Sequence, residues 1–156
     1  RSSQLENTEQ YPLFGRPIPT NGGDAIALCL YLQSINVRQL AVLHVNDNYG
    51  VEFLVDVKRE AEFFGISIFD AGYKDGLDEE LNNAIAQLKT SGCTYFFGIF
   101  SAGGWQDIVI RLYEEGLLGQ PQSVWLFGET VIDIFVQRLM LNNERETNIA
   151  QAMNGT

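Results

Sequence analysis

Histidine, cysteine and cationic residues are all scarce in this sequence. Of its 156 residues, one is His, two are Cys and ten are Lys or Arg, against 20 Asp and Glu, so the net charge is −10. A surface this acidic repels a phosphate backbone, which argues against nucleic acid as a partner. His44, Cys29 and Cys93 lack the close spacing of zinc ligands, so we predict no metal site.

Long hydrophobic runs are missing as well. No apolar run approaches the roughly 20 residues that a membrane-spanning helix needs, and no signal-peptide pattern opens the chain. The chain begins with Arg1 rather than Met, and we interpret it as a mature chain or a part of a longer protein. Its ten Phe, six Tyr and two Trp exclude intrinsic disorder, and its length suits one domain.

The common enzyme motifs are also absent. There is no G-x-G-x-x-G, no G-x-x-x-x-G-K-[ST] and no G-x-S-x-G, so we predict a non-enzyme that carries no cofactor. His44 lies within the apolar run LAVLHV, which favours a buried strand residue over a catalytic base. Cys29 and Cys93 adjoin apolar runs and are interpreted as core thiols, with a disulfide left open.

Short apolar runs alternate with helical patterns along the chain. The runs at 40–45, 66–71, 94–100 and 124–128 are typical of strands that are covered on both faces. Between them lie amphipathic helices, such as the one with Leu54, Val57, Ala61 and Phe64 inward and Asp56 among the charged residues of its solvent face.

This alternation predicts an α/β fold: a doubly wound, mainly parallel sheet of four to five strands with helices on both faces. Three parts are expected along the chain. Residues 1–20 form an extended lead-in, residues 21–140 an α/β lobe, with a last helix near its end, and residues 141–156 a polar tail.

Polar loops follow the predicted strands. Parallel sheets bind ligands beyond the carboxyl ends of their strands, where the strand order reverses. If the order is 2-1-3-4, the reversal lies between the first and third strands. The loops there contain polar and aromatic side chains suited to a small polar molecule: Asn46, Asp47 and Tyr49 after the first strand, Ser101 and Ala102 after the third, and Glu129 after the fourth. The alternative is that these are ordinary turn and cap residues.

Three stretches resemble the second lobe of the receptor ligand-binding family, the type I periplasmic-binding-protein-like Venus-flytrap domains. The lead-in is similar to S-[ST]-x-x-L followed by Y-P-x-F-x-R-T-x-P-[SP]-[DN], although Pro17 replaces the usual Thr. The stretch AVLHVNDNYG resembles the family's strand followed by D-x-x-Y-G, and VWLFGE resembles its V-W-[IL] strand. The lead-in matches are Ser2, Ser3, Leu5, Tyr11, Pro12, Phe14, Arg16, Pro19 and Asn21.

The resemblance implies one lobe of a hinged receptor domain that closes around an amino-acid-like small molecule and signals by hinge closure. It implies a ligand-side role for Asn21, Tyr49, Ser101 and Glu129, and hinge hydroxyls at Ser2 and Ser3. It further implies an extracellular or periplasmic location, a first lobe of the same membrane receptor as partner, and a possible homodimer.

Three other functions remain open. The chain is alternatively a soluble solute-binding protein that feeds an amino-acid transporter, or a lobe used for peptide sensing or dimerisation. A flavodoxin-like or receiver-like regulatory enzyme would share the sheet, but a receiver needs an acidic residue where Phe100 and Ser101 stand.

Overall fold

The structure is a computed structural model, which describes residues 9–10, 20–101 and 104–128. Its centre is a parallel sheet of four strands: β1 (Gln39–Val45), β2 (Ser67–Tyr73), β3 (Tyr95–Ile99) and β4 (Val124–Phe127). The strand order is β2-β1-β3-β4, the order on which the predicted position of the ligand loops depended. The predicted α/β class and helix–strand alternation are therefore confirmed over the described residues.

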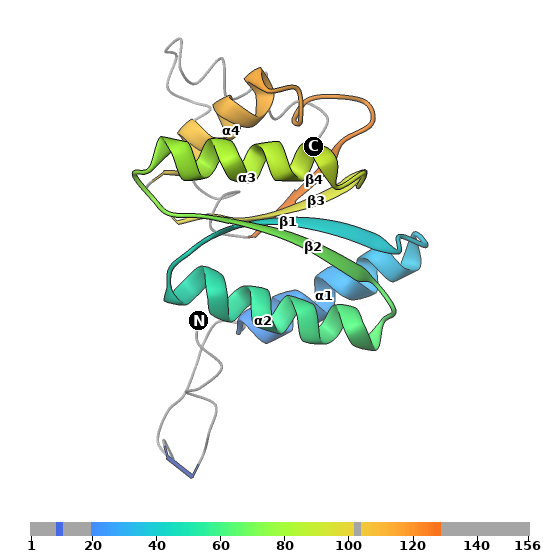
Figure 1. The fold of residues 1–156 in the computed structure, drawn as a ribbon. Coiled ribbons are helices and arrows are strands. Elements are labelled where there is room, and N and C mark those ends of the chain that lie inside the picture. Colours follow the sequence, from blue (N-terminus) through green and yellow to red (C-terminus); the bar gives the residue numbers. More distant parts are fainter. Residues whose placement is uncertain (1–8, 11–19, 102–103, 129–156) are drawn as a thin grey trace, which may run out of the picture.

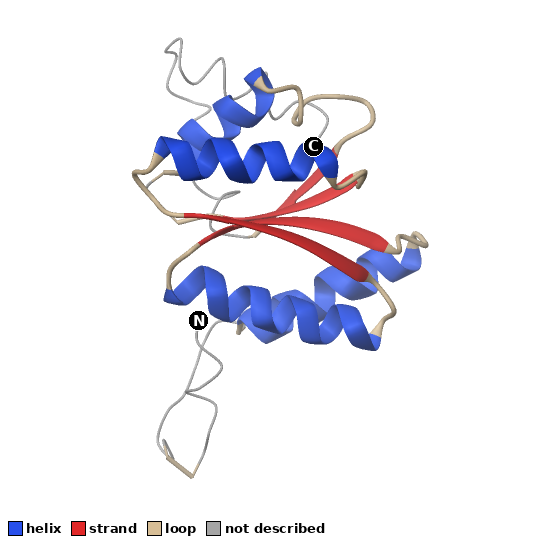
Figure 2. Ribbon diagram, viewed as in Figure 1, coloured by secondary structure: helices blue, strands red, loops and turns tan. Residues whose placement is uncertain are grey.

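Helices cover both faces of the sheet (Figures 1 and 2). Helices α1 (Asn21–Ser34) and α2 (Asn48–Phe63) lie on one face, and α3 (Asp78–Thr90) and α4 (Trp105–Glu114) lie on the other (Figure 1). Successive residues of β1 enter different cores, because side chains alternate along a strand: Leu40 and Val42 pack with α1 and α2, whereas Ala41 and Leu43 pack with α3 and α4.

Local sequence explains where several helices begin and end. Thr20 caps α1 by accepting a hydrogen bond from the Gly23 N–H (3.2 Å), and Asp47 caps α2 by accepting one from the Gly50 N–H (2.7 Å). Gly65 follows α2 with φ +66°, a left-handed conformation that favours glycine and stops a helix.

Two expectations about individual segments are wrong. Strand β2 extends to Tyr73, two residues beyond the predicted end at Ala71, because Gly72 and Tyr73 still pair with His44 and Val45 of β1. Asp56 is only 2% exposed instead of facing solvent, because it lies beside Gly22 of α1, where it also forms an ion pair with Arg59 (2.8 Å). The last predicted helix and the tail lie outside the described residues.

Both cysteines are free, and their environments differ. Cys29 is fully buried in α1, and burial raises the pKa of its thiol to about 11, with the nearby Glu60 charge adding to the effect. Cys93 is only half-buried.

We predict that one thiol per chain reacts with Ellman's reagent in the folded protein at pH 8, and that both react in urea. A buried thiol that remains protonated at this pH reacts slowly, because the thiolate is the nucleophile. The Cys93→Ser variant is expected to show no fast reaction until it unfolds. A fast native reaction in that variant would contradict the buried position of Cys29.

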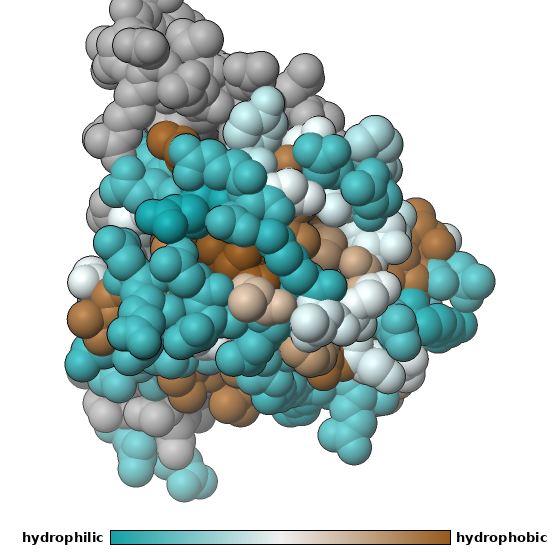
Figure 3. All heavy atoms as spheres, turned by 45° about the horizontal axis from the view of Figure 1, so that its top comes forward, coloured by the Kyte–Doolittle hydropathy of each residue, from teal (hydrophilic) through white to brown (hydrophobic). Residues whose placement is uncertain are grey.

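The surface above α3 and α4 is mainly hydrophilic. Figure 3 shows this face, with hydrophobic side chains visible in a hollow among hydrophilic ones. In the part of the chain that the structure describes, no helix combines the length and apolar character needed to cross a bilayer.

Candidate functional site

The carboxyl edge of the sheet contains the predicted reversal of strand order. The chain leaves β1 toward α2 on one face and leaves β3 toward α4 on the opposite face, although β1 and β3 are neighbours in the sheet. The loops that follow these two strands therefore diverge, and a crevice at such a point is where open parallel sheets bind ligands. We use the name switch crevice for the loop residues Asn46–Tyr49 and Ser101 at this edge; the cavities of about 250 and 140 Å³ near it are lined by other residues.

The β1 side of the crevice is built by the turn into α2. Asn46 continues the pairing of β1 beyond its end, since its N–H donates to the Tyr73 carbonyl (2.6 Å). The Asn46 and Asp47 residues are exposed. Asp47 also caps α2 by accepting a hydrogen bond from the Gly50 N–H, so the alternative that it is a cap residue is confirmed.

Tyr49 is half-buried at the base of this turn. Its ring contacts both hydrophobic cores, and it meets the Phe53 ring edge-on at a centroid distance of 6.0 Å. An aromatic ring held in this way offers a rigid surface for a ligand, because little side-chain entropy is lost on binding.

The β3 side of the crevice is joined to the loop after β2. The Ser101 hydroxyl donates a hydrogen bond to the Oδ2 atom of Asp75, and this contact spans the end of the intervening strand β1. The sequence interpretation did not select Asp75, because it considered the loops after the first, third and fourth strands and not the loop after β2, to which Asp75 belongs.

Tyr73 lies beneath the same loops, as the last residue of β2. Its side chain is 2% exposed, and its hydroxyl has no hydrogen-bond partner. Burial, followed by the negative charges of Asp75 and Asp47, raises the pKa of this phenol well above its ordinary value. The hydroxyl is therefore neutral and able to donate at every physiological pH.

Not every predicted ligand-binding residue lies in the switch crevice or within the described part of the chain. Asn21 is the first residue of α1 and is 1% exposed, and its Oδ1 atom has no hydrogen-bond partner. Its neighbour Gly22 faces Asp56 and Arg59 of α2. Four predicted residues lie outside the described part: the loop residues Ala102 and Glu129 and the hinge hydroxyls Ser2 and Ser3.

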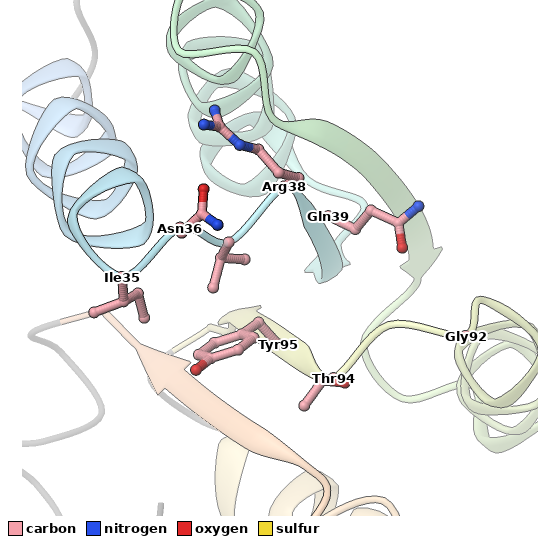
Figure 4. A pocket seen from close by; sticks show the side chains of 8 residues that line it. Ile35, Asn36, Arg38, Gln39, Gly92, Thr94 and Tyr95 are labelled. Atoms are coloured by element: carbon pink, nitrogen blue, oxygen red, sulfur yellow. The ribbon is translucent and has the colours of Figure 1, made fainter.

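A wide depression lies at the opposite, amino edge of the sheet. It has a volume of about 450 Å³ and is bordered by Ile35, Asn36, Arg38, Thr94 and Tyr95. Figure 4 shows the Arg38 guanidinium turned away from the Tyr95 ring, so these two groups do not converge on a common ligand position. Although this depression is large, we therefore prefer the carboxyl edge, with its polar groups, as the candidate ligand site.

Metal binding finds no support among the described side chains. No group of three or more His, Cys, Asp or Glu residues is placed there to hold a metal ion. The His44 ring is buried, and both of its nitrogens face groups within the sheet. Its Nε2 atom lies 3.8 Å from Asp70, and its Nδ1 atom lies 3.4 Å from the Val45 carbonyl.

Comparison with known proteins assigns no family. No protein-family model matches the chain, and no curated protein matches it significantly.

Proposed function

We propose that this chain is a ligand-sensing lobe that binds an amino-acid-like small molecule in the switch crevice. In this proposal it is one lobe of a type I periplasmic-binding-protein-like domain, it lies on the extracellular or periplasmic face as part of a membrane receptor, and closure against a first lobe transmits binding. The observation that carries the proposal is the reversal of strand order between β1 and β3, which brings the Asn46–Tyr49 turn and Ser101 to one edge.

The side chains at this edge suit a zwitterion. The Asp47 carboxylate attracts an ammonium group, Tyr49 offers an apolar face, and the backbone N–H groups of the first turn of α4 suit a carboxylate, whereas the Ser101 hydroxyl donates its hydrogen bond to Asp75. A single lobe supplies only one wall of a cleft, so we expect weak binding, with a dissociation constant of about 1 mM or higher.

The proposal is tested by following amide chemical shifts of the ¹⁵N-labelled chain during titration with glycine, glutamate and γ-aminobutyrate. We expect one of them to give saturable shifts at Gly50 and Ser101. The Asp47→Ser variant is expected to lose about tenfold in affinity or more, because a hydrogen bond to a charged group is worth about 1.5–3 kcal/mol. The Tyr49→Ala variant is expected to lose a similar amount, because it removes the apolar face of the site.

Asp47→Ser separates binding from folding, because a serine hydroxyl still caps α2 while the charge is lost. Glu62→Gln, an exposed position of α2, is the matched loss of one negative charge elsewhere and should leave affinity unchanged. The proposal fails if none of the three compounds gives saturable shifts with folded protein, or if Asp47→Ser and Tyr49→Ala bind as well as the wild type.

A further inference from the structure

A cavity of about 250 Å³ lies between α1 and the edge strand β4, on the α1 and α2 side of the sheet. One face of α1 contributes four lining residues, spaced at i, i+3, i+4 and i+7: Asp24, Ala27, Leu28 and Tyr31. The other described lining residues are Phe53 of α2, Phe97 of β3, and Leu126, Phe127 and Gly128 at and just after the end of β4. None of these is a residue of the switch crevice, so the cavity is a separate feature.

The floor of the cavity is apolar and firmly packed. Phe97 and Leu126 pair directly across β3 and β4, so their side chains lie at the same level on one face of the sheet. The Phe53 ring meets the Phe97 ring edge-on at a centroid distance of 5.6 Å. Both phenylalanines are buried in the core of this face, so the floor is in place before any ligand binds.

The mouth of the cavity is open to solvent. Tyr31 is 48% exposed and Ala27 is also exposed, while Asp24, Leu126 and Gly128 are half-buried. In the part of the chain that the structure describes, β4 is an edge strand with no further strand beside it. A small molecule can therefore pass Tyr31 and reach Leu126 without displacing a buried side chain.

The size and the lining of the cavity favour an aromatic ring. A cavity of about 150 Å³ lined by Leu, Ile and Phe holds one benzene molecule, so this larger cavity has room for a ring with a short chain attached. The rings of Tyr31, Phe53 and Phe97 line it, and aromatic rings pack against one another edge-on or offset.

The charge at the rim favours a cation. Asp24 is the one charged residue among the described residues that line the cavity. Arg59 reaches α1 at Gly22, but Gly22 and Asp24 lie about 200° apart around the helix, so this guanidinium is on the α2 side of α1, away from the cavity. A carboxylate has about four acceptor positions, so Asp24 can bind an ammonium group in addition to its contacts within the protein.

We propose that this cavity binds a small arylalkylammonium cation, with its ring among Leu28, Phe97 and Leu126 and its ammonium group at Asp24. The Tyr31 ring at the mouth adds cation–π attraction. Occupation of the cavity does not require that the switch crevice be functional, because the two sites share no residue and the ring is the part of the molecule that the cavity recognises.

The test is a titration of the ¹⁵N- and ¹³C-methyl-labelled chain with phenethylammonium chloride, replacing sodium chloride at constant ionic strength. We expect saturable shifts of the Ala27 and Gly128 amides, and nuclear Overhauser effects between the ligand ring and the methyl groups of Leu28 and Leu126. Ethylammonium, which lacks the ring, should give no saturable shift. Phenylacetate, in which a carboxylate replaces the ammonium, should bind about threefold more weakly or worse, because the Asp24 charge repels it.

Three variants locate the interaction. Asp24→Asn should weaken phenethylammonium binding about threefold or more and remove most of its preference over phenylacetate, because the attraction between the charges is lost. Glu80→Gln is the matched control, since it removes a negative charge from the first turn of α3 as Asp24→Asn does from α1, and it should leave the affinity within twofold. Asp47→Ser should bind phenethylammonium as the wild type does.

The proposal is overturned if the shifts do not saturate, if ethylammonium binds as well as phenethylammonium, or if Asp24→Asn keeps both the affinity and the preference over phenylacetate. It is equally overturned if the shifts appear at Gly50 and are lost in Asp47→Ser, since the molecule would then bind in the switch crevice. Amino-acid binding in the crevice is decided separately, by glycine, glutamate and γ-aminobutyrate.

Discussion

Replacement of Gly50 by alanine is expected to destabilise the protein by about 3 kcal/mol or more. An added Cβ atom would lie 2.0 Å from the Val45 carbonyl oxygen and 2.8 Å from its Cγ1 atom. Val45 ends the central strand β1 and pairs with Tyr73 of β2, so its backbone has little freedom to move away. The shortest contact is thus between the new methyl group and a backbone carbonyl oxygen, which no side-chain rotation relieves.

Urea denaturation followed by far-ultraviolet circular dichroism measures this effect, and the thermal midpoint should fall by about 10 °C for a domain of this size. Gly22→Ala is the matched control. A Cβ atom there would meet its nearest neighbour, the Thr20 hydroxyl, at an ordinary 3.5 Å, so we expect a stability equal to or slightly above that of the wild type. Equal stability of Gly50→Ala and Gly22→Ala would contradict the close approach of α2 to β1.

This glycine also relates the fold to the candidate site. Gly50 lets the first turn of α2 rest directly on the end of β1, and its N–H is the donor that Asp47 caps. Tyr49 is consequently drawn against Phe53 and both cores at the base of the switch crevice. Packing alone therefore explains why Tyr49 and Gly50 follow the apolar strand β1, whether or not a ligand binds.

The sheet was predictable because parallel strands that are buried on both faces have short, nearly continuous apolar sequences. The run at 40–45 corresponds to β1, and the alternation with helical stripes predicted the α/β class. The strand order was only assumed, and the structure has the assumed order. The end of β2 was not predictable in this way. Gly72 and Tyr73 resemble a turn, whereas Gly72 in fact leaves room for the side chains of His44 and Asn46 on the neighbouring strand.

One residue of the candidate site was missed. The sequence analysis considered the loops beside the reversal of strand order and not the loop after β2, although the structure places Asp75 of that loop in contact with Ser101. Asp56 was misplaced for a different reason: helical periodicity identifies apolar faces, and Asp56 is buried beside Gly22 of α1 by the packing of α1 against α2, which no local pattern encodes. Asn46, Asp47, Tyr49 and Ser101 were placed correctly at the edge because strand ends alone determine their position.

Replacement of Trp125 by alanine is expected to cost about 3–5 kcal/mol. Trp125 belongs to the edge strand β4, most of which is only half-buried, yet its own side chain is 1% exposed. Its ring stacks on Phe96 at 4.9 Å and on Phe127 at 5.8 Å. Its indole N–H donates to the Leu117 carbonyl (2.7 Å), which ties β4 to the segment after α4. Truncation removes all of these contacts and opens a cavity beside α4.

Trp125→Phe divides this loss into its parts, since it retains an aromatic ring but leaves the buried Leu117 carbonyl without its donor; we expect an intermediate cost of about 1–3 kcal/mol. Phe63→Ala is the control for removing an aromatic side chain, because Phe63 is 81% exposed and its loss should change stability by no more than about 0.5 kcal/mol. With Trp125 replaced, Trp105 is the single tryptophan, and its fluorescence reports unfolding of the same core. If Trp125→Ala were as stable as Phe63→Ala, β4 would not be anchored through this side chain. The pairing of β4 with β3, which places Gly128 at the carboxyl edge, would then have to be stabilised by other contacts.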